Sequence, residues 1–173
     1  MASRLKVTLL AKDHDVASFD CGIHALNTWF KTIASQHQKI GTSRVYVLID
    51  EENPVTILGF FAMAVRGLTP TGELPEAMQK KLPMAVSGYT LARLAVSTEE
   101  RGKGFGERLL LEAMEKAYRA AQNVGGFALF VDAKDGAASF YEKYGFQAFP
   151  DDPHTLVLPI ASMPEFLGEH PET

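Results

Sequence analysis

The sequence has little cysteine and no long apolar segment. Cys21 is the only cysteine among the 173 residues, which excludes an internal disulfide and points to a reducing compartment. The longest apolar stretch, residues 57–65, is far shorter than the roughly 20 residues that a membrane-spanning helix needs. Residues 1–14 lack the apolar core and cleavage pattern of a signal peptide. We therefore expect a soluble, cytoplasmic protein with no membrane partner.

The sequence also lacks an excess of positive charge. The chain has 17 Lys and Arg against 21 Asp and Glu, a formal net charge of −4 with histidine neutral, so its overall charge gives no indication of nucleic-acid binding. The histidines show no metal-ligand spacing, and the sequence contains no Gly-x-Ser-x-Gly motif. We expect no metal cofactor. The remaining composition, 46% apolar and 22% charged, is typical of a globular domain.

Apolar periodicity predicts one mixed α/β domain. Apolar runs predict strands over residues 5–10, 45–49, 56–65, 89–96, 127–131, 146–149 and 155–160. Helical periodicity predicts helices over 22–37, 105–121 and 135–143, with a shorter one over 76–82. Ser18 or Asp20 would cap the first helix. We expect residues 1–162 to form a single domain, followed by a loose polar tail over 163–173.

A glycine-rich segment stands between an apolar strand and the long predicted helix. Glycine lets the backbone approach a ligand closely, and the first N–H groups of a helix have no partner within it. Together with the positive end of the helix dipole, these groups favour an anion. The sequence therefore predicts a site for the pyrophosphate of a cofactor, made by Arg101, Gly102, Lys103, Gly104, Phe105 and Gly106.

Three phosphate-binding motifs compete for this segment. A Walker loop requires Ser or Thr after Gly-Lys, but glycine follows Lys103. A dinucleotide fingerprint starting in the same loop would need glycine where Glu107 stands. The third pattern is Arg or Gln, two residues, Gly, one residue, and Gly or Ala. It is met by Arg101, Gly104 and Gly106.

This third pattern, after a Leu-Ala-Val strand end, resembles the coenzyme A loop of the Gcn5-related N-acetyltransferases (GNAT). That family also carries Ala, three residues, Tyr, three residues and Gly-Phe, and Ala137, Tyr141, Gly145 and Phe146 match this spacing. The resemblance covers about residues 44–160. It implies an α/β (α+β) domain with a mixed, mostly antiparallel central sheet, two splayed strands beside the cofactor, and flanking helices.

The resemblance also implies roles for individual residues. The co-substrate would be acetyl-CoA, whose pantetheine arm would bond the backbone of Leu94, Ala95 and Val96. Tyr141 would be the catalytic acid, because a phenol held at the thioester sulfur can supply a proton as the thiolate leaves. We interpret Tyr144 as core packing. Lys134 departs from the family pattern, since many relatives have asparagine there.

No general base stands out in the sequence. Glu99 and Glu100 lie near the strand end, but acidic residues in loops are most often solvated surface charges. A lysine amine has a pKa near 10.4, whereas an α-amine has a pKa of about 7.7–8.0 and is partly neutral at pH 7. A site poor in bases therefore favours an aminoacyl α-amine over a lysine side chain as the acceptor.

A narrower resemblance lies in the first half of the chain. The segments Phe19–Gly22, Leu26–Phe30, Gly41–Arg44 and Leu91–Val96 are similar to toxin acetyltransferases of type II toxin–antitoxin pairs. These toxins acetylate the amino acid of charged tRNA and are restrained by a ribbon-helix-helix antitoxin. The resemblance implies an aminoacyl-tRNA acceptor, an antitoxin partner and a homodimer. Arg93 interrupts an apolar strand, so we expect it either to point toward the acceptor or to pair with a buried acid.

Two other functions stay open. The first is a GNAT enzyme that acetylates a small-molecule amine or a protein N-terminus and has no toxin role; the net negative charge favours it over a tRNA-directed enzyme. The second is a non-catalytic module that binds acyl-CoA, against which Tyr141 argues.

Overall fold

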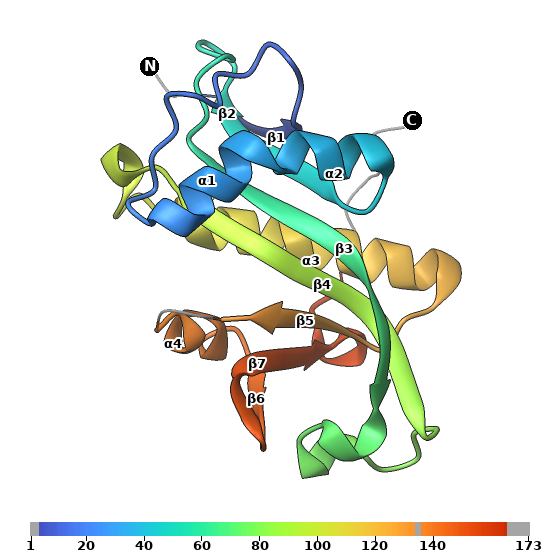
Figure 1. Cartoon of the computed structure of the whole chain (residues 1–173). Helices are drawn as coiled ribbons and strands as arrows, with labels where there is room; N and C mark the ends of the chain where they lie inside the picture. The colour runs from blue at the N-terminus through green and yellow to red at the C-terminus, as the bar shows by residue number, and fades with distance from the viewer. Residues whose placement is uncertain (1–3, 134–135, 166–173) are drawn as a thin grey trace. The chain divides into compact units, whose positions relative to one another are not determined.

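The computed structural model describes residues 4–133 and 136–165. Its seven strands are hydrogen-bonded in the order β1-β2-β3-β4-β5-β7-β6 (Figure 1). The chain forms two compact units, Met1–Val65 with Thr90–Ala113, and Arg66–Tyr89 with Met114–Thr173. Three elements contribute to both units: β3 (Gly59–Pro70), β4 (Ala85–Val96) and α3 (Phe105–Val124).

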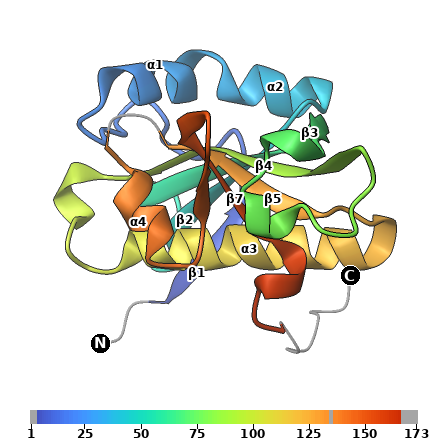
Figure 2. The ribbon, with the colours of Figure 1, turned by 90° about the horizontal axis from the view of Figure 1, so that it is seen from below.

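In the first unit, helices pack on an antiparallel sheet. β1 (Leu5–Leu9) pairs with β2 (Arg44–Asp50), and β2 pairs with β3, both antiparallel. Figure 2 shows α1 (His24–Thr32) and α2 (Ala34–Ile40) together on one side of β1 and β2. Alternation along β2 directs Val45, Val47 and Ile49 into the core that these helices cover.

Aromatic rings fill the core of the first unit. Phe30 of α1 stacks on Phe60 of β3 with ring centroids 4.0 Å apart, and Phe19 meets both rings edge-on. Trp29 also stacks on Phe60, at 6.2 Å. Offset and edge-to-face pairs of this kind add stabilisation beyond the burial of apolar area. They fix α1 against β3.

The second unit has its own sheet and core. β7 (Asp152–Pro159) pairs antiparallel with both β5 (Ala128–Asp132) and β6 (Gln147–Phe149), with a register shift at Ala148 and Phe149. The short helix α4 (Ala138–Glu142) precedes β6. The buried apolar cluster of this unit consists of Leu74, Val86, Ala128, Phe130, Phe149 and Val157.

β4 and β5 approach each other closely at Gly88. The Phe127 N–H donates a hydrogen bond to the Ser87 carbonyl at 2.8 Å. A Cβ atom at position 88 would lie only 2.1 Å from the Ala128 carbonyl oxygen. Only glycine fits here without a shift of the backbone, because no flexible side chain can move aside.

Several predicted elements differ from the structure. The helix expected over 22–37 is two helices, separated at Ile33, whose φ of −119° departs from helical values. Neither Ser18 nor Asp20 caps the first helix: it begins at His24 after an extended Ile23 without a side-chain cap. Asp20 instead accepts hydrogen bonds from the Gly22 N–H and the Asn27 amide.

The middle of the chain holds longer strands than predicted. β3 runs to Pro70 and β4 begins at Ala85, whereas the sequence predicted strands over 56–65 and 89–96. The helix expected over 76–82 is a single 3-10 turn, Glu76–Met78. The predicted helix start at Asp135, together with Lys134, lies outside the described residues. The single-domain boundary at 162 and the loose tail stay predictions.

Among the described residues, no helix combines the length and apolar character needed to cross a membrane.

We predict that Gly88→Ala destabilises the protein by about 1–3 kcal/mol, because the added methyl group overlaps a backbone carbonyl. Gly67→Ala on β3 is the matched control, since nothing lies within 4 Å of a Cβ there; its effect should stay within about 0.5 kcal/mol. Urea unfolding of both variants measures the difference. Equal midpoints would contradict the close approach of the two strands.

Candidate active site

The candidate cofactor loop follows the end of β4. At this strand end Ala95 is buried, whereas Leu94 and Val96 are half-buried. The chain then makes a 3-10 turn, Thr98–Glu100, before the loop of residues 101–104 and the start of α3 at Phe105. The turn is held by hydrogen bonds from the Ser97 N–H to the Leu58 carbonyl and from the Thr98 N–H to the Asp20 carbonyl, both 2.9 Å.

Two glycines of this loop have left-handed backbone conformations. Gly102 has φ +82° and Gly104 has φ +80°, values that residues with a side chain rarely adopt. Nothing lies within 4 Å of the position that a Cβ would take at either glycine. The backbone there faces open space, which suits the close approach of a ligand.

The loop leads directly into a long helix. The Gly104 carbonyl accepts a hydrogen bond from the Arg108 N–H at 3.1 Å. This bond marks the first helical turn, so the N–H groups of residues 105–107 precede the first donor bonded within α3. They combine with the positive end of the dipole of a 20-residue helix to favour an anion. The residues present therefore fit a pyrophosphate group.

The two cations of the loop have protein partners. Lys103 Nζ lies 2.6 Å from Glu100 Oε2 and forms an ion pair. Arg101 Nη2 donates a hydrogen bond to the Cys21 carbonyl oxygen, also at 2.6 Å. We therefore expect backbone N–H groups, more than these side chains, to make up an anion site in this loop.

Tyr141 lies on α4 in the second unit. Its side chain is buried, with 6% of the residue exposed, and its ring meets Phe140 and Phe146 edge-on at 5.1 and 5.7 Å. Burial raises the pKa of the Tyr141 phenol well above its ordinary value. The hydroxyl is therefore neutral, and able to donate a hydrogen bond, throughout the physiological pH range.

The motif around Tyr141 matches the limits of α4. Ala137 is the residue before the helix, and the Gly145 N–H closes its last turn by donating to the Glu142 carbonyl at 3.1 Å. Tyr144 is half-buried and packs on Phe140 with ring centroids 5.5 Å apart, in keeping with a packing role. Phe146 is buried.

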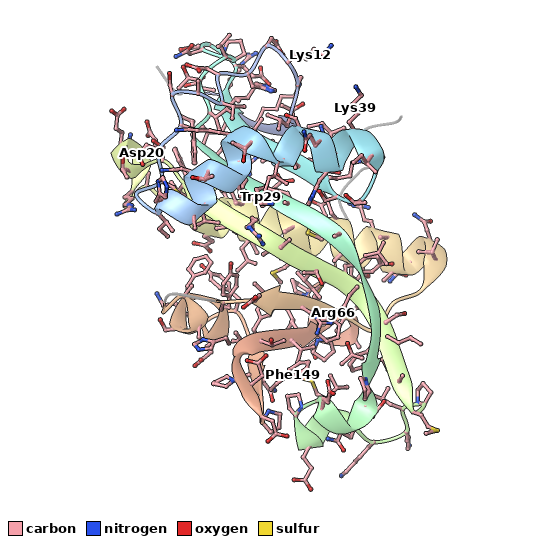
Figure 3. All side chains as sticks on the ribbon, viewed as in Figure 1. Lys12, Asp20, Trp29, Lys39, Arg66 and Phe149 are labelled. Carbon is pink, nitrogen blue, oxygen red and sulfur yellow. The ribbon has the colours of Figure 1, made fainter. Side chains whose placement is uncertain are left out.

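Arg93 has an aromatic neighbour that the sequence did not indicate. Its guanidinium carbon lies 5.0 Å from the ring centroid of Trp29, and its Nη1 donates to the Ala92 carbonyl at 2.8 Å. Trp29 points from α1 toward β4 in Figure 3. The cation–π contact joins β4 to α1. A role for Arg93 toward the acceptor stays a prediction.

A pocket of about 390 Å³ lies in the first unit, beside the turn that precedes the glycine loop. It is lined by Asp15, Ser18, Phe19, Asp20, Thr56, Ile57, Ser97, Thr98 and Glu99. None of the residues that the sequence singled out for cofactor or catalysis lines it. Glu99 borders this pocket and Glu100 pairs with Lys103, so the structure adds no general base to the predicted site. Within residues 4–133 and 136–165, no cluster of three acidic, His or Cys residues suits a metal.

Known proteins are similar along nearly the whole chain. A tRNA-acetylating toxin of Mycobacterium tuberculosis (strain ATCC 25618 / H37Rv) is 31% identical over 156 residues, which cover 90% of this chain and 92% of that protein. The structure of AtaT complexed with acetyl-methionyl-tRNAfMet has a TM-score of 0.85 and 29% identity, covering 92% of this chain and 96% of that one.

A second similar structure is a Tyr-to-Phe mutant of the toxin AtaT, bound to the C-terminus of the antitoxin AtaR and acetyl-CoA. Its TM-score is 0.77 at 26% identity, and the match covers 92% of this chain and 95% of that one.

The family model of the acetyltransferase (GNAT) domain matches residues 41–148, a segment that contains the strand end of β4, the glycine loop and the tyrosine motif. With this match and the extended sequence identity to a curated relative, the chain belongs to the GNAT family of acetyltransferases.

Proposed function

We propose that this protein is an N-acetyltransferase that moves the acetyl group of acetyl-CoA to the α-amine of an aminoacyl-tRNA, as the toxin of a toxin–antitoxin pair. The observation that carries the proposal is the similarity over nine-tenths of the chain to a tRNA-acetylating toxin and to a structure holding acetyl-methionyl-tRNA. The antitoxin complex of AtaT supports a peptide antitoxin as partner. Charged tRNA is cytoplasmic, so the protein would act there.

We assign the cofactor-binding role to the strand end 94–96 and the loop 101–106. The N–H groups at the start of α3 would bind the pyrophosphate, and the strand end would offer backbone groups to the amides of the pantetheine arm. This arrangement needs two strands to diverge so that the backbone of β4 is free to bond; the splaying stays a prediction. Lys103 would add positive charge near the phosphates while paired with Glu100.

When bound, acetyl-CoA supplies an acetyl thioester: the amine nitrogen attacks its carbonyl carbon, the carbon–sulfur bond breaks, and the sulfur leaves as a thiolate. We assign to Tyr141 the role of contacting this sulfur through its hydroxyl group. The neutral phenol donates its O–H toward the developing charge. The attacking nitrogen releases its proton to water, which suffices because an α-amine is already partly neutral at pH 7.

An ordinary phenol has a pKa of about 10, and burial raises the pKa of the Tyr141 phenol further. A thiol has a pKa near 8.5, below that of a buried phenol, so complete proton transfer from Tyr141 to the thiolate is uphill. The residue therefore acts chiefly by hydrogen-bond donation to sulfur, with proton sharing in the transition state. The thiol of coenzyme A obtains its proton from solvent after it leaves.

We predict that purified protein converts aminoacyl-tRNA and acetyl-CoA into N-acetyl-aminoacyl-tRNA, and that Tyr141→Phe lowers kcat by roughly 100- to 1,000-fold, as for loss of one hydrogen-bond donor to a developing negative charge. Mass spectrometry of the nuclease-digested tRNA measures the product. Tyr144→Phe is the matched control and should retain turnover. Acetylation of small amines or peptide N-termini with no reaction on aminoacyl-tRNA would support the alternative acceptor class instead.

We predict that Gly104→Ala weakens binding of acetyl-CoA at least about tenfold, because a Cβ strains the loop and covers the N–H groups that would face the phosphates. Gly41→Ala is the matched control: its φ of +91° imposes a similar strain, also with open space around the Cβ, at the end of α2. Calorimetry gives both affinities. Equal weakening in the two variants would show that backbone strain alone is responsible.

The pKa of Tyr141 also gives a prediction for stability. Because burial raises its pKa in the folded state, the unfolded chain ionises first as the pH passes about 10. Ionisation then favours the unfolded state, so stability falls with rising pH. Tyr141→Phe lacks this contribution. We expect the stability difference between wild type and variant to shift in favour of the variant from pH 9 to pH 11, measured by denaturant unfolding; a constant difference would contradict the burial of the phenol.

A further inference from the structure

Arg101 stands first in the glycine loop, but its side chain is turned to another segment. Its Nη2 donates to the carbonyl oxygen of Cys21, eighty residues earlier in the chain, at 2.6 Å. Cys21 is buried, with 2% of the residue exposed, and lies just before α1. A hydrogen bond from a charged donor is stronger than a neutral one, so this contact is a firm link between loop and helix.

The segment that receives Arg101 is itself fixed to α1. Asp20 Oδ1 accepts hydrogen bonds from the Gly22 N–H and from Asn27 Nδ2, each at 2.8 Å. The Cys21 N–H donates to Asn27 Oδ1 at 2.9 Å. Asn27 belongs to the first turns of α1. We name this group, Asp20, Cys21, Gly22, Asn27 and Arg101, the clasp.

Packing around the clasp is tight. A Cβ at Gly22 would lie 2.9 Å from Arg101 Nη2 and 3.3 Å from Thr98 Cγ2, and Gly22 has φ +83°. The Thr98 N–H also donates to the Asp20 carbonyl at 2.9 Å. Asp20 lies beside this turn in Figure 3. The turn before the cofactor loop and the segment before α1 therefore touch along both backbone and side chains.

The charge of Asp20 is stabilised within the clasp. Hydrogen bonds from the Gly22 N–H and the Asn27 side chain lower the pKa of the Asp20 carboxyl, with smaller contributions from the positive charges of Lys31 and Arg101. The carboxylate is thus ionised at neutral pH and keeps both of its acceptor contacts.

We propose that Arg101 is a positioning residue that transmits occupancy of the cofactor loop to α1. Coenzyme A would order the loop, and the Arg101–Cys21 bond would pass that restraint through Asn27 into the helix. α1 carries Trp29, the aromatic partner of Arg93, so the restraint acts on the side of the first unit where β4 and α1 meet. Coupling of this kind needs no change of shape, only a loss of motion on binding. The inference rests on the proposed function, because it assumes that the loop binds coenzyme A.

Hydrogen exchange with free coenzyme A as the probe tests the proposal. In wild type, saturating coenzyme A should slow exchange of the amides in residues 24–32. Arg101→Ala is measured at a coenzyme A concentration that calorimetry shows to be saturating for this variant. The added protection of these amides should then fall about tenfold, as expected for loss of a charged hydrogen bond. Arg101→Lys, which can still donate to the Cys21 carbonyl, should restore much of it.

Arg108→Ala is the matched control, because Arg108 pairs with Glu112 on α3 and lies outside the clasp; it should keep the wild-type response. Gly22→Ala strains the same contact from the other side and should also lose the response. It serves as the test variant if Arg101→Ala proves unfolded. The proposal would be overturned if coenzyme A added no protection to α1 in wild type. It would also be overturned if the added protection were the same in wild type, Arg101→Ala and Gly22→Ala. Either result would leave the proposed function intact. Failure of coenzyme A to bind wild type in calorimetry would instead overturn the proposed function, and this inference with it.

Discussion

The N–H groups at the start of α3 are the constraint on which the candidate cofactor site depends. A helix start leaves these groups without internal acceptors, and Gly102 and Gly104, both left-handed, present backbone without a Cβ just before them. The loop cations are engaged elsewhere, with Lys103 on Glu100 and Arg101 on Cys21. The anion binding that we propose there would therefore depend on backbone geometry, and a Cβ added at Gly102 or Gly104 would act on it directly.

The aromatic core of the first unit gives that loop a fixed support. Phe30, Phe60 and Phe19 lock α1 and the segment before it onto β3. Cys21 is buried in the same core, so the carbonyl that receives Arg101 is held by packing. Apolar burial therefore positions the Cys21 carbonyl oxygen, and its hydrogen bond with the Arg101 guanidinium connects this core to the loop.

The sequence was most informative where a ligand geometry demands particular residue types at a fixed spacing. The alternating glycines before α3 and the motif from Ala137 to Phe146 both have this character, and they predicted the family correctly. The net charge of −4 argued against a nucleic-acid acceptor, yet a summed charge says nothing about the local placement of basic groups. The proposed acceptor class rests instead on the similarity to a tRNA-acetylating toxin and to a structure that holds acetyl-methionyl-tRNA.

Features set by contacts distant in sequence could not be predicted. The separation of α1 from α2 at Ile33, the direction of the Arg101 side chain and the contact of Arg93 with Trp29 all depend on segments brought together by folding. The assumed capping role of Asp20 was wrong for the same reason, since its carboxylate has better partners in Gly22 and Asn27. Sequence rules indicate which local conformations and hydrogen bonds a residue favours, and tertiary contacts determine which of these the folded protein adopts.

Trp29 is the only tryptophan of the chain, and it lies nearly buried between Phe60, His37 and the Arg93 guanidinium. All indole fluorescence of the protein therefore originates at the junction of α1 and β4. The emission wavelength of tryptophan depends on the polarity around the indole, and its intensity depends on nearby charge. The intrinsic fluorescence of the protein therefore reports on this junction without an added label.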